Sequence, residues 1–214
     1  MKSILIFISC IVLGFFIVFF TFSKKATTDI ARPKEAKELP ISQFSVENPP
    51  SNSLHGDITL LSGATKWQSR TATEASVITQ KRSIQQGETL LTGDTGNVSV
   101  AFPDMLFTLT ENSTLNFIQT LPSNVVLEQK EGNITYENTS SNPLAIRVYP
   151  MLIEQIQSTA KISIDDDLGT TTIKITTGSA TVAYNDSDNI STVEKITAGH
   201  TMTFDTSTRT SVIK

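Results

Sequence analysis

Side chains able to do metal or acid–base chemistry are few in this chain of 214 residues. It contains one cysteine, Cys10, and two histidines, His55 and His200. A single cysteine can form neither a disulfide framework nor a thiolate metal site. Because the histidines are far apart and have no cysteine near them, we expect surface imidazoles rather than metal ligands.

Two acidic stretches carry the oxygen atoms that calcium prefers as ligands. They are 165–169, which reads Asp-Asp-Asp-Leu-Gly, and 185–189, which reads Asn-Asp-Ser-Asp-Asn. Neither has the spaced glutamate that closes a twelve-residue calcium loop, and both lie between strand-like runs where Asp, Asn and Gly are ordinary turn residues. We interpret both as turns and predict no metal site and no cofactor.

Catalysis and nucleic-acid binding are also poorly supported. Neither a Gly-x-Ser-x-Gly nor a His-Glu-x-x-His pattern occurs, so no local motif predicts an enzyme. The net charge is -4, and from residue 55 onward 11 Lys and Arg stand against 17 Asp and Glu. Lys81-Arg82 is the only basic doublet in that part, too small a patch to neutralise a phosphate backbone. We therefore predict no catalytic residues and no nucleic-acid partner.

The elements that would position a site begin with an apolar amino-terminal segment. Residues 4–22 contain no charge, and at ~1.5 Å per residue they span roughly 29 Å, about one bilayer core. We predict a short cytoplasmic end at 1–3 and a transmembrane signal anchor at 4–23. The alternative is a signal peptide cleaved before Lys24; a lipoprotein site at Cys10 is less well supported because very little apolar sequence precedes it.

The charges that flank this anchor and the nature of the body favour opposite orientations. Only Lys2 precedes the span, whereas five cations follow it, and the positive-inside rule would then keep the body cytoplasmic. The nature of the body favours export, and we expect an extracytoplasmic body. The five cations are Lys24, Lys25, Arg32, Lys34 and Lys37.

Residues 24–54 read as a linker, because prolines and charges are mixed there without a sustained apolar period. From 55 to 214 the chain holds 28 threonines and many valines and isoleucines, which favour strands. Short alternating runs such as 98–102 and 162–164 are bounded by turn residues. We predict an all-β domain at 55–214, either an irregular solenoid-like stack or a sandwich, with Trp67 as a core anchor.

A recurring motif supports this interpretation. A glycine and a polar residue precede alternating apolar positions that end in an aromatic residue at 96–102, 132–136 and 178–184. We read the glycine as a turn that leads into a strand burying alternate residues. The successive intervals are too uneven for a repeat of fixed period.

Four stretches together resemble the extracytoplasmic domain of the FecR family, which is known for iron-siderophore signalling regulators. In order they are a glycine turn into a strand, an apolar-Pro-Asp turn with a following strand, a strand–Glu-Gly–strand element, and two closing strand–glycine units. The resemblance covers roughly 57–205. The stretches are 90–102, 102–115, 126–136 and 175–199.

This resemblance implies the fold and an extracytoplasmic location more than it implies a signalling role. Signalling members of the family carry a cytoplasmic sigma-factor-binding segment before their membrane helix, and here only Met1, Lys2 and Ser3 precede the span. The family's Gly-Ser after the aspartate is Met105-Leu106 in this chain.

The expected function is therefore a membrane-anchored, periplasmic or cell-surface, FecR-like binding domain without enzymatic activity. It would serve envelope signalling or scaffolding by binding an envelope protein or polymer. Three alternatives remain open: an envelope transport or assembly component whose β domain carries an apolar ligand, control of a sigma factor through the span or a partner subunit, and, more remotely, a hydrolase.

Overall fold

The computed structural model describes residues 48–214. The anchor predicted at 4–23 and most of the linker predicted at 24–54 lie outside these residues. Within residues 48–214, no helix is long and apolar enough to cross a membrane. The described part of the chain consists of strands and turns, which confirms the all-β prediction.

The described residues contain fifteen strands. Most are short, as the sequence predicts, but three of them have 15 or 16 residues. The strands are β1 (Gly56–Ser62), β2 (Thr65–Gln68), β3 (Ser76–Val77), β4 (Ser83–Ile84), β5 (Thr89–Thr92), β6 (Asn97–Phe102), β7 (Met105–Leu109), β8 (Thr114–Leu121), β9 (Asn124–Asn138), β10 (Leu144–Val148), β11 (Met151–Asp165), β12 (Thr170–Asn185), β13 (Ser191–Thr197), β14 (Thr201–Asp205) and β15 (Thr210–Ile213).

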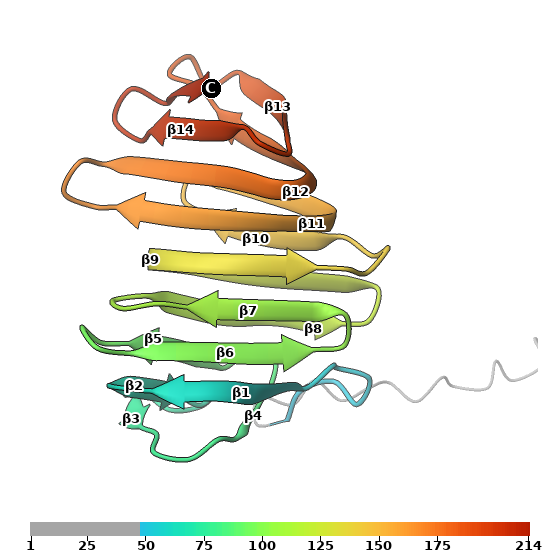
Figure 1. Ribbon diagram of the computed structural model, residues 1–214, viewed down its shortest axis with the longest axis vertical. Coiled ribbons are helices and arrows are strands. Elements are labelled where there is room, and N and C mark those ends of the chain that lie inside the picture. The colour runs from blue at the N-terminus through green and yellow to red at the C-terminus, as the bar shows by residue number, and fades with distance from the viewer. Residues whose placement is uncertain (1–47) are drawn as a thin grey trace, which may run out of the picture. The chain divides into compact units, whose positions relative to one another are not determined.

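All fifteen strands belong to one continuous hydrogen-bonded sheet, unlike the two separate sheets of a sandwich. The sheet is folded over into two layers, so that the strands form a stack (Figure 1). The first layer contains β4, β1, β6, β7, β14 and β15, and the second contains β3, β2, β5, β8, β10 and β13. The long strands β9, β11 and β12 contribute one half to each layer. Every pairing is antiparallel except that of β9 with β10.

The long strands pass from one layer to the other at sharp bends. In β9, the part before Gly132 pairs with β8 and the part after it pairs with β7. Gly132 has a φ of 80°, and the bends of β11 and β12 contain Gln157 at 46° and Gly178 at 72°. Positive φ is easily adopted by glycine because it lacks a Cβ. The predicted turn glycines at 132 and 178 thus lie inside long strands, where they bend the strand, rather than between two strands.

The core lies between the two layers and is built from alternate residues of each strand. The recurring motif confirms this prediction, because the apolar positions of its three copies, at 98–102, 134–136 and 180–184, point inward and are buried. Phe102, Phe107, Phe117 and Tyr136 form the aromatic centre, with ring centroids 5.6 to 6.3 Å apart. Trp67 is partly buried against this core, as predicted.

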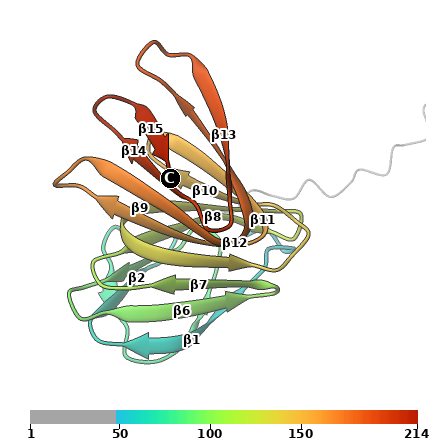
Figure 2. The same cartoon turned by 45° about the horizontal axis from the view of Figure 1, so that its top comes forward.

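The amino-terminal end of the stack is covered by the chain between β2 and β5. The Arg82 guanidinium carbon lies 3.3 Å from the centre of the Trp67 ring, and Ile84 of the same segment is fully buried. The opposite end is formed by β13 in one layer and by β14 and β15 in the other (Figure 2). Each of the strands β13 and β15 pairs with only one neighbour.

Candidate functional site

The residues singled out from the sequence as possible metal ligands do not come together. His55 and His200 are both exposed, as predicted, and the Nδ1 of His200 lies 3.2 Å from the Thr197 hydroxyl. The acidic stretches at 165–169 and 185–189 form the connections after β11 and after β12, which confirms the turn interpretation. Among residues 48–214, no group of three His, Cys, Asp or Glu side chains could hold a metal ion.

A Ser-x-x-Lys spacing at 158–161 has the form of a serine nucleophile with its lysine base. The structure argues against that chemistry. Both residues lie in the extended strand β11, where positions three apart point to opposite faces. The Ser158 hydroxyl is buried and donates to the Gln155 side chain at 3.2 Å, whereas Lys161 is exposed.

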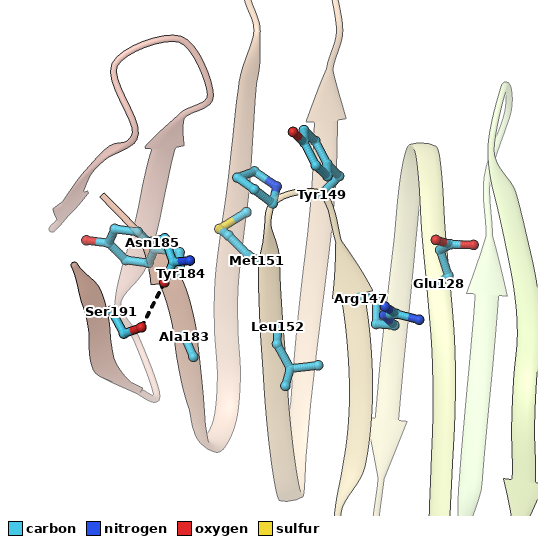
Figure 3. Close-up of a pocket in the computed structure, with 10 residues that line it drawn as sticks. Glu128, Arg147, Tyr149, Met151, Leu152, Ala183, Tyr184, Asn185 and Ser191 are labelled. Atoms are coloured by element: carbon cyan, nitrogen blue, oxygen red, sulfur yellow. Dashed lines mark hydrogen bonds between the residues drawn. The ribbon is translucent and has the colours of Figure 1, made fainter. Parts of the chain in front are cut away.

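The best-formed surface hollow lies on the outer face of the second layer, and we call it the β10–β11 groove. It has a volume of about 440 Å³ and crosses the strands from β9 to β13 (Figure 3). It follows the β10–β11 hairpin and extends to Asn185 at the end of β12 and Ser191 at the start of β13. The lining residues are Glu128, Arg147, Tyr149, Pro150, Met151, Leu152, Ala183, Tyr184, Asn185 and Ser191.

The floor of the groove is one row of directly opposed residues. Glu128 of β9 is opposite Arg147 of β10, Arg147 is opposite Leu152 of β11, and Leu152 is opposite Ala183 of β12. Opposed residues of a ladder share one face of the sheet, which is why segments distant in sequence meet here. The row therefore places an acid, a base and two aliphatic side chains side by side.

The rim of the groove is aromatic on one side and polar on the other. Tyr149, in the two-residue turn between β10 and β11, is 83% exposed. Across the groove, the Ser191 hydroxyl donates to the Asn185 side chain at 2.8 Å (Figure 3). A large aromatic ring this exposed can cover a side chain bound beneath it, because it offers an apolar face and a hydroxyl together.

The groove offers binding groups but no catalytic pair. Arg147 is exposed, and among the described residues no hydrogen bond engages its guanidinium. The Tyr184 hydroxyl is turned away from the groove and lies 3.2 Å from a carboxylate oxygen of Glu194. Burial raises the pKa of Tyr184, and the nearby charge of Glu194 adds to this increase. Arginine with an apolar floor suits a partner that carries a carboxylate beside an aliphatic or aromatic side chain.

A second hollow, of about 590 Å³, lies where β9 bends and where β11 turns into β12. Its lining is acidic and includes Glu111, Glu131 and the run Asp165–Asp167. The Asp165 side chain accepts the Leu168 backbone N–H at 3.0 Å, as in an ordinary turn. This hollow has the surface character of a solvated turn cluster, and the β10–β11 groove is the better candidate for binding.

No local pattern in the sequence points to the groove residues. The sequence around Arg147, Tyr149 and Leu152 has only the alternation of ordinary strands. Their neighbours Glu128 and Ala183 come from other strands. Only the register of the sheet reveals the row. The Tyr149-Pro150 dipeptide is the one signal that could have drawn attention, because it is a turn with an aromatic side chain.

Comparison with known proteins finds solved structures with a similar fold. No protein-family model and no curated protein matches the chain. Two crystal structures of a candidate anti-sigma factor from Parabacteroides distasonis have a similar fold, each with a TM-score of 0.52 and 11% sequence identity. Each match covers 59% of this chain and 58% of the other, so the chain spans a little over half the length of that protein. At this low sequence identity, the structural similarity shows a common fold only.

Proposed function

We propose that the chain is a FecR-like regulatory binding domain without enzymatic activity, held at a bacterial membrane by residues 4–23 with its body outside the cytoplasm. Its partner is an envelope protein that contacts the β10–β11 groove. The observation on which this rests is the shared fold with a candidate anti-sigma factor. The groove supports binding because it has exposed anchoring side chains and no nucleophile beside a base.

The interior of the domain favours this function over the transport of an apolar ligand. Inward side chains on both layers, such as Phe107, Leu127 and Ile162, are 0% exposed. They pack into a continuous core instead of lining a cavity. A carrier would need apolar space between the layers, whereas the hollows named above lie on the outer surface and at the turns.

Site-specific crosslinking in intact cells tests the partner. A photoreactive phenylalanine analogue replaces Tyr149 in the full chain, and the matched control carries it at Leu60, which is 45% exposed on the outer face of the first layer. We expect a crosslinked envelope protein from position 149 and none from position 60. Equal capture at both positions, or capture of lipid alone, contradicts the proposal.

Two further measurements test location and regulation separately. A reporter joined after Lys214 should be active only if it is of the kind that requires export; activity confined to a cytoplasm-dependent reporter contradicts the orientation. Deletion of the gene should change the transcripts that depend on one sigma factor. An unchanged transcript profile would remove the regulatory part and leave a scaffolding role.

A further inference from the structure

The two ends of the stack expose different lengths of strand edge. At the amino-terminal end the edge strands β3 and β4 have two residues each, and the segment containing Arg82 covers the core. At the other end β13 has seven residues and pairs only with β12. Its register with β12 is regular throughout, and its sequence contains no proline. Bulges and prolines are among the devices that prevent an edge strand from pairing further, so the free edge of β13 is a template for another strand.

The hydrogen-bonding pattern identifies the backbone groups of β13 that are free. Ala198 donates to the Gly178 carbonyl at 2.9 Å, and in an antiparallel ladder such bonded positions alternate with positions whose N–H and C=O groups point away from the partner. Ser191, Val193 and Lys195 therefore present both backbone groups at the free edge. A row of alternating donors and acceptors at this spacing is complemented by the backbone of another extended polypeptide, and neither a lipid nor a sugar carries that alternation.

The side chains of these three residues lie on the outer face of the second layer, where they continue the floor of the β10–β11 groove. Val193 is directly opposite Ala183, the member of the floor row that lies in β12. Val193 is also 67% exposed, so the row ends at the free edge with an aliphatic side chain that nothing covers in the described residues. A strand added to β13 would extend the row by one residue beside Val193.

We infer that the envelope partner contributes an extended segment that pairs with β13 as an additional antiparallel strand. This inference rests on the proposed function, because the same partner would contact the groove. The antiparallel direction follows the rest of the sheet, in which every pairing but that of β9 with β10 is antiparallel. The segment carries an apolar residue beside Val193 and, two positions earlier, an acidic residue beside Lys195, because cross-strand neighbours stabilise a sheet when both are apolar or when their charges are opposite.

A second copy of this chain fits the edge less well than a separate segment does. In a two-fold pair of β13 strands, an axis at Glu194 or at Lys195 sets two like charges opposite each other. With the axis at Val193, β15 of each copy meets the turn before β15 of the other, because Ser211 of β15 lies beside Glu194. An extended segment of another protein avoids both conflicts, since it has to fit only one edge.

Photocrosslinking from two positions of the full chain in intact cells tests the inference. The photoreactive phenylalanine analogue replaces Val193 in one strain and Tyr149 in another. At position 193 the side chain points to the outer face and leaves the edge itself free. The control carries the analogue at Val77, which is also 67% exposed but lies at the covered end. We expect the protein captured at position 149 to be captured at position 193 as well, through a segment with an acidic residue two positions before an apolar one, and no capture at position 77.

The outcomes separate this inference from the proposed function. Capture at position 149 without capture at position 193 overturns the inference and leaves the proposed function standing. A crosslink between two copies of the chain at position 193, or equal capture at position 77, also overturns the inference. No capture at either 149 or 193 contradicts both.

Edge variants of the full chain in detergent complete the test. The probe is a synthetic peptide with the sequence crosslinked at position 193, and fluorescence anisotropy measures its affinity. Val193→Pro removes an N–H that makes no bond within the chain, and Lys195→Glu places a carboxylate opposite the acid of the segment. We expect each variant to weaken binding at least tenfold.

The matched control for the proline variant is Ile213→Pro on the edge of β15. Lys214 and Thr201 exchange both backbone hydrogen bonds at 2.9 Å, so alternation turns the N–H of Ile213 away from β14. This variant should bind the peptide as tightly as the unmodified chain. Failure of the unmodified chain to bind the peptide, or equal affinity of all three variants, overturns the inference; K195E decides the matter if V193P does not fold.

Discussion

The Ser211 hydroxyl lies between the two carboxylate oxygens of Glu194, 2.8 Å from each, and so joins the last strand of one layer to the last strand of the other. Tyr184 completes the group from β12, with its hydroxyl 2.9 Å from that of Ser211. The three side chains form a polar group at this end of the interior. Glu194 and Ser211 belong to different layers and are 17 residues apart in sequence, so the group forms only when both layers are in place at this end of the stack.

Removing the carboxylate should loosen this end of the stack. Glu194→Ala deprives two hydroxyls of their acceptor, and we expect the free energy of unfolding to fall by about 1–2 kcal/mol. Urea denaturation measures this loss, and amide hydrogen exchange should quicken in β13 and β15. Lys195→Ala, on the exposed outer face of the same strand, is the control and should change the free energy by less than about 0.5 kcal/mol. Equal effects of both substitutions would contradict the role of the group.

The bend glycines should tolerate alanine much less well than a turn glycine does. A Cβ at Gly132 would lie 2.3 Å from the Asn112 carbonyl oxygen, and one at Gly178 would lie 2.4 Å from that of Gln157. Strain at positive φ costs about 1–2 kcal/mol, and the backbone clash adds to it. We therefore expect Gly132→Ala and Gly178→Ala each to cost more than about 2 kcal/mol in thermal or urea unfolding.

Gly169 is the matched control for these bends. It also has a positive φ, of 60°, but nothing lies within 4 Å of a Cβ placed there. Gly169→Ala should cost about 1 kcal/mol, the strain alone. If all three substitutions were equally costly, the close backbone approach at the bends would not be the reason for glycine.

Alkaline pH should unfold the domain through its buried tyrosines. Burial raises the pKa of Tyr136 well above the ordinary value of 10.0, and burial also raises that of Tyr184. A raised pKa means that the folded state favours the neutral phenol. The resulting stability is complete below pH 10, where the unfolded phenol is also neutral, and is lost as the pH rises toward the folded pKa.

Tyrosinate absorbance and circular dichroism, followed together against pH, check this prediction. Ionisation of Tyr136 should coincide with loss of the β signal. Tyr136→Phe should weaken the dependence of stability on alkaline pH. At neutral pH it should cost about 1–3 kcal/mol, because the side-chain oxygen of Gln129 loses its donor at 3.0 Å. Ionisation of all tyrosines without unfolding would contradict the assignment.

The aromatic centre should dominate the stability of the middle of the stack. Phe107 is fully buried and lies near Phe102, Phe117 and Tyr136. Phe107→Ala should lower the free energy of unfolding by about 3–5 kcal/mol, and Phe107→Leu by a smaller amount, because the leucine fills much of the space. Denaturation of the two variants measures the difference. Equal losses would contradict this explanation, because they would mean that filling the space with leucine recovers no stability.

Local patterns in the sequence were sufficient to predict the strands but not their layering. Alternation at 98–102 and 132–136 reports which residues point inward, because side-chain direction in a strand depends only on neighbours in the chain. Whether a strand continues through Gly132 or ends there depends on Asn112 and Ser113, which are distant in sequence and pack against it. The local pattern therefore predicts strand starts at positions where the structure has bends.

The residues of the β10–β11 groove could not be predicted from the sequence for the same reason. Arg147 and Leu152 are ordinary strand residues until the register of three strand pairs places them beside Glu128 and Ala183. Tyr149 could have been noticed as an aromatic turn residue, but its exposure depends on the surrounding turns. The acidic turns, in contrast, were predictable, because their side chains bond to backbone groups two to four residues away.

The membership of β9, β11 and β12 in both layers has a mechanical consequence. Tension applied along the stack loads the ladders between neighbouring strands, and a ladder at either end can yield one bond at a time, like a zipper. At the three bent strands, a break in one layer leaves the strand anchored in the other, so two ladders must fail before the chain lengthens. A pulling experiment should therefore find the edges yielding first and the middle of the stack acting as a mechanical stop.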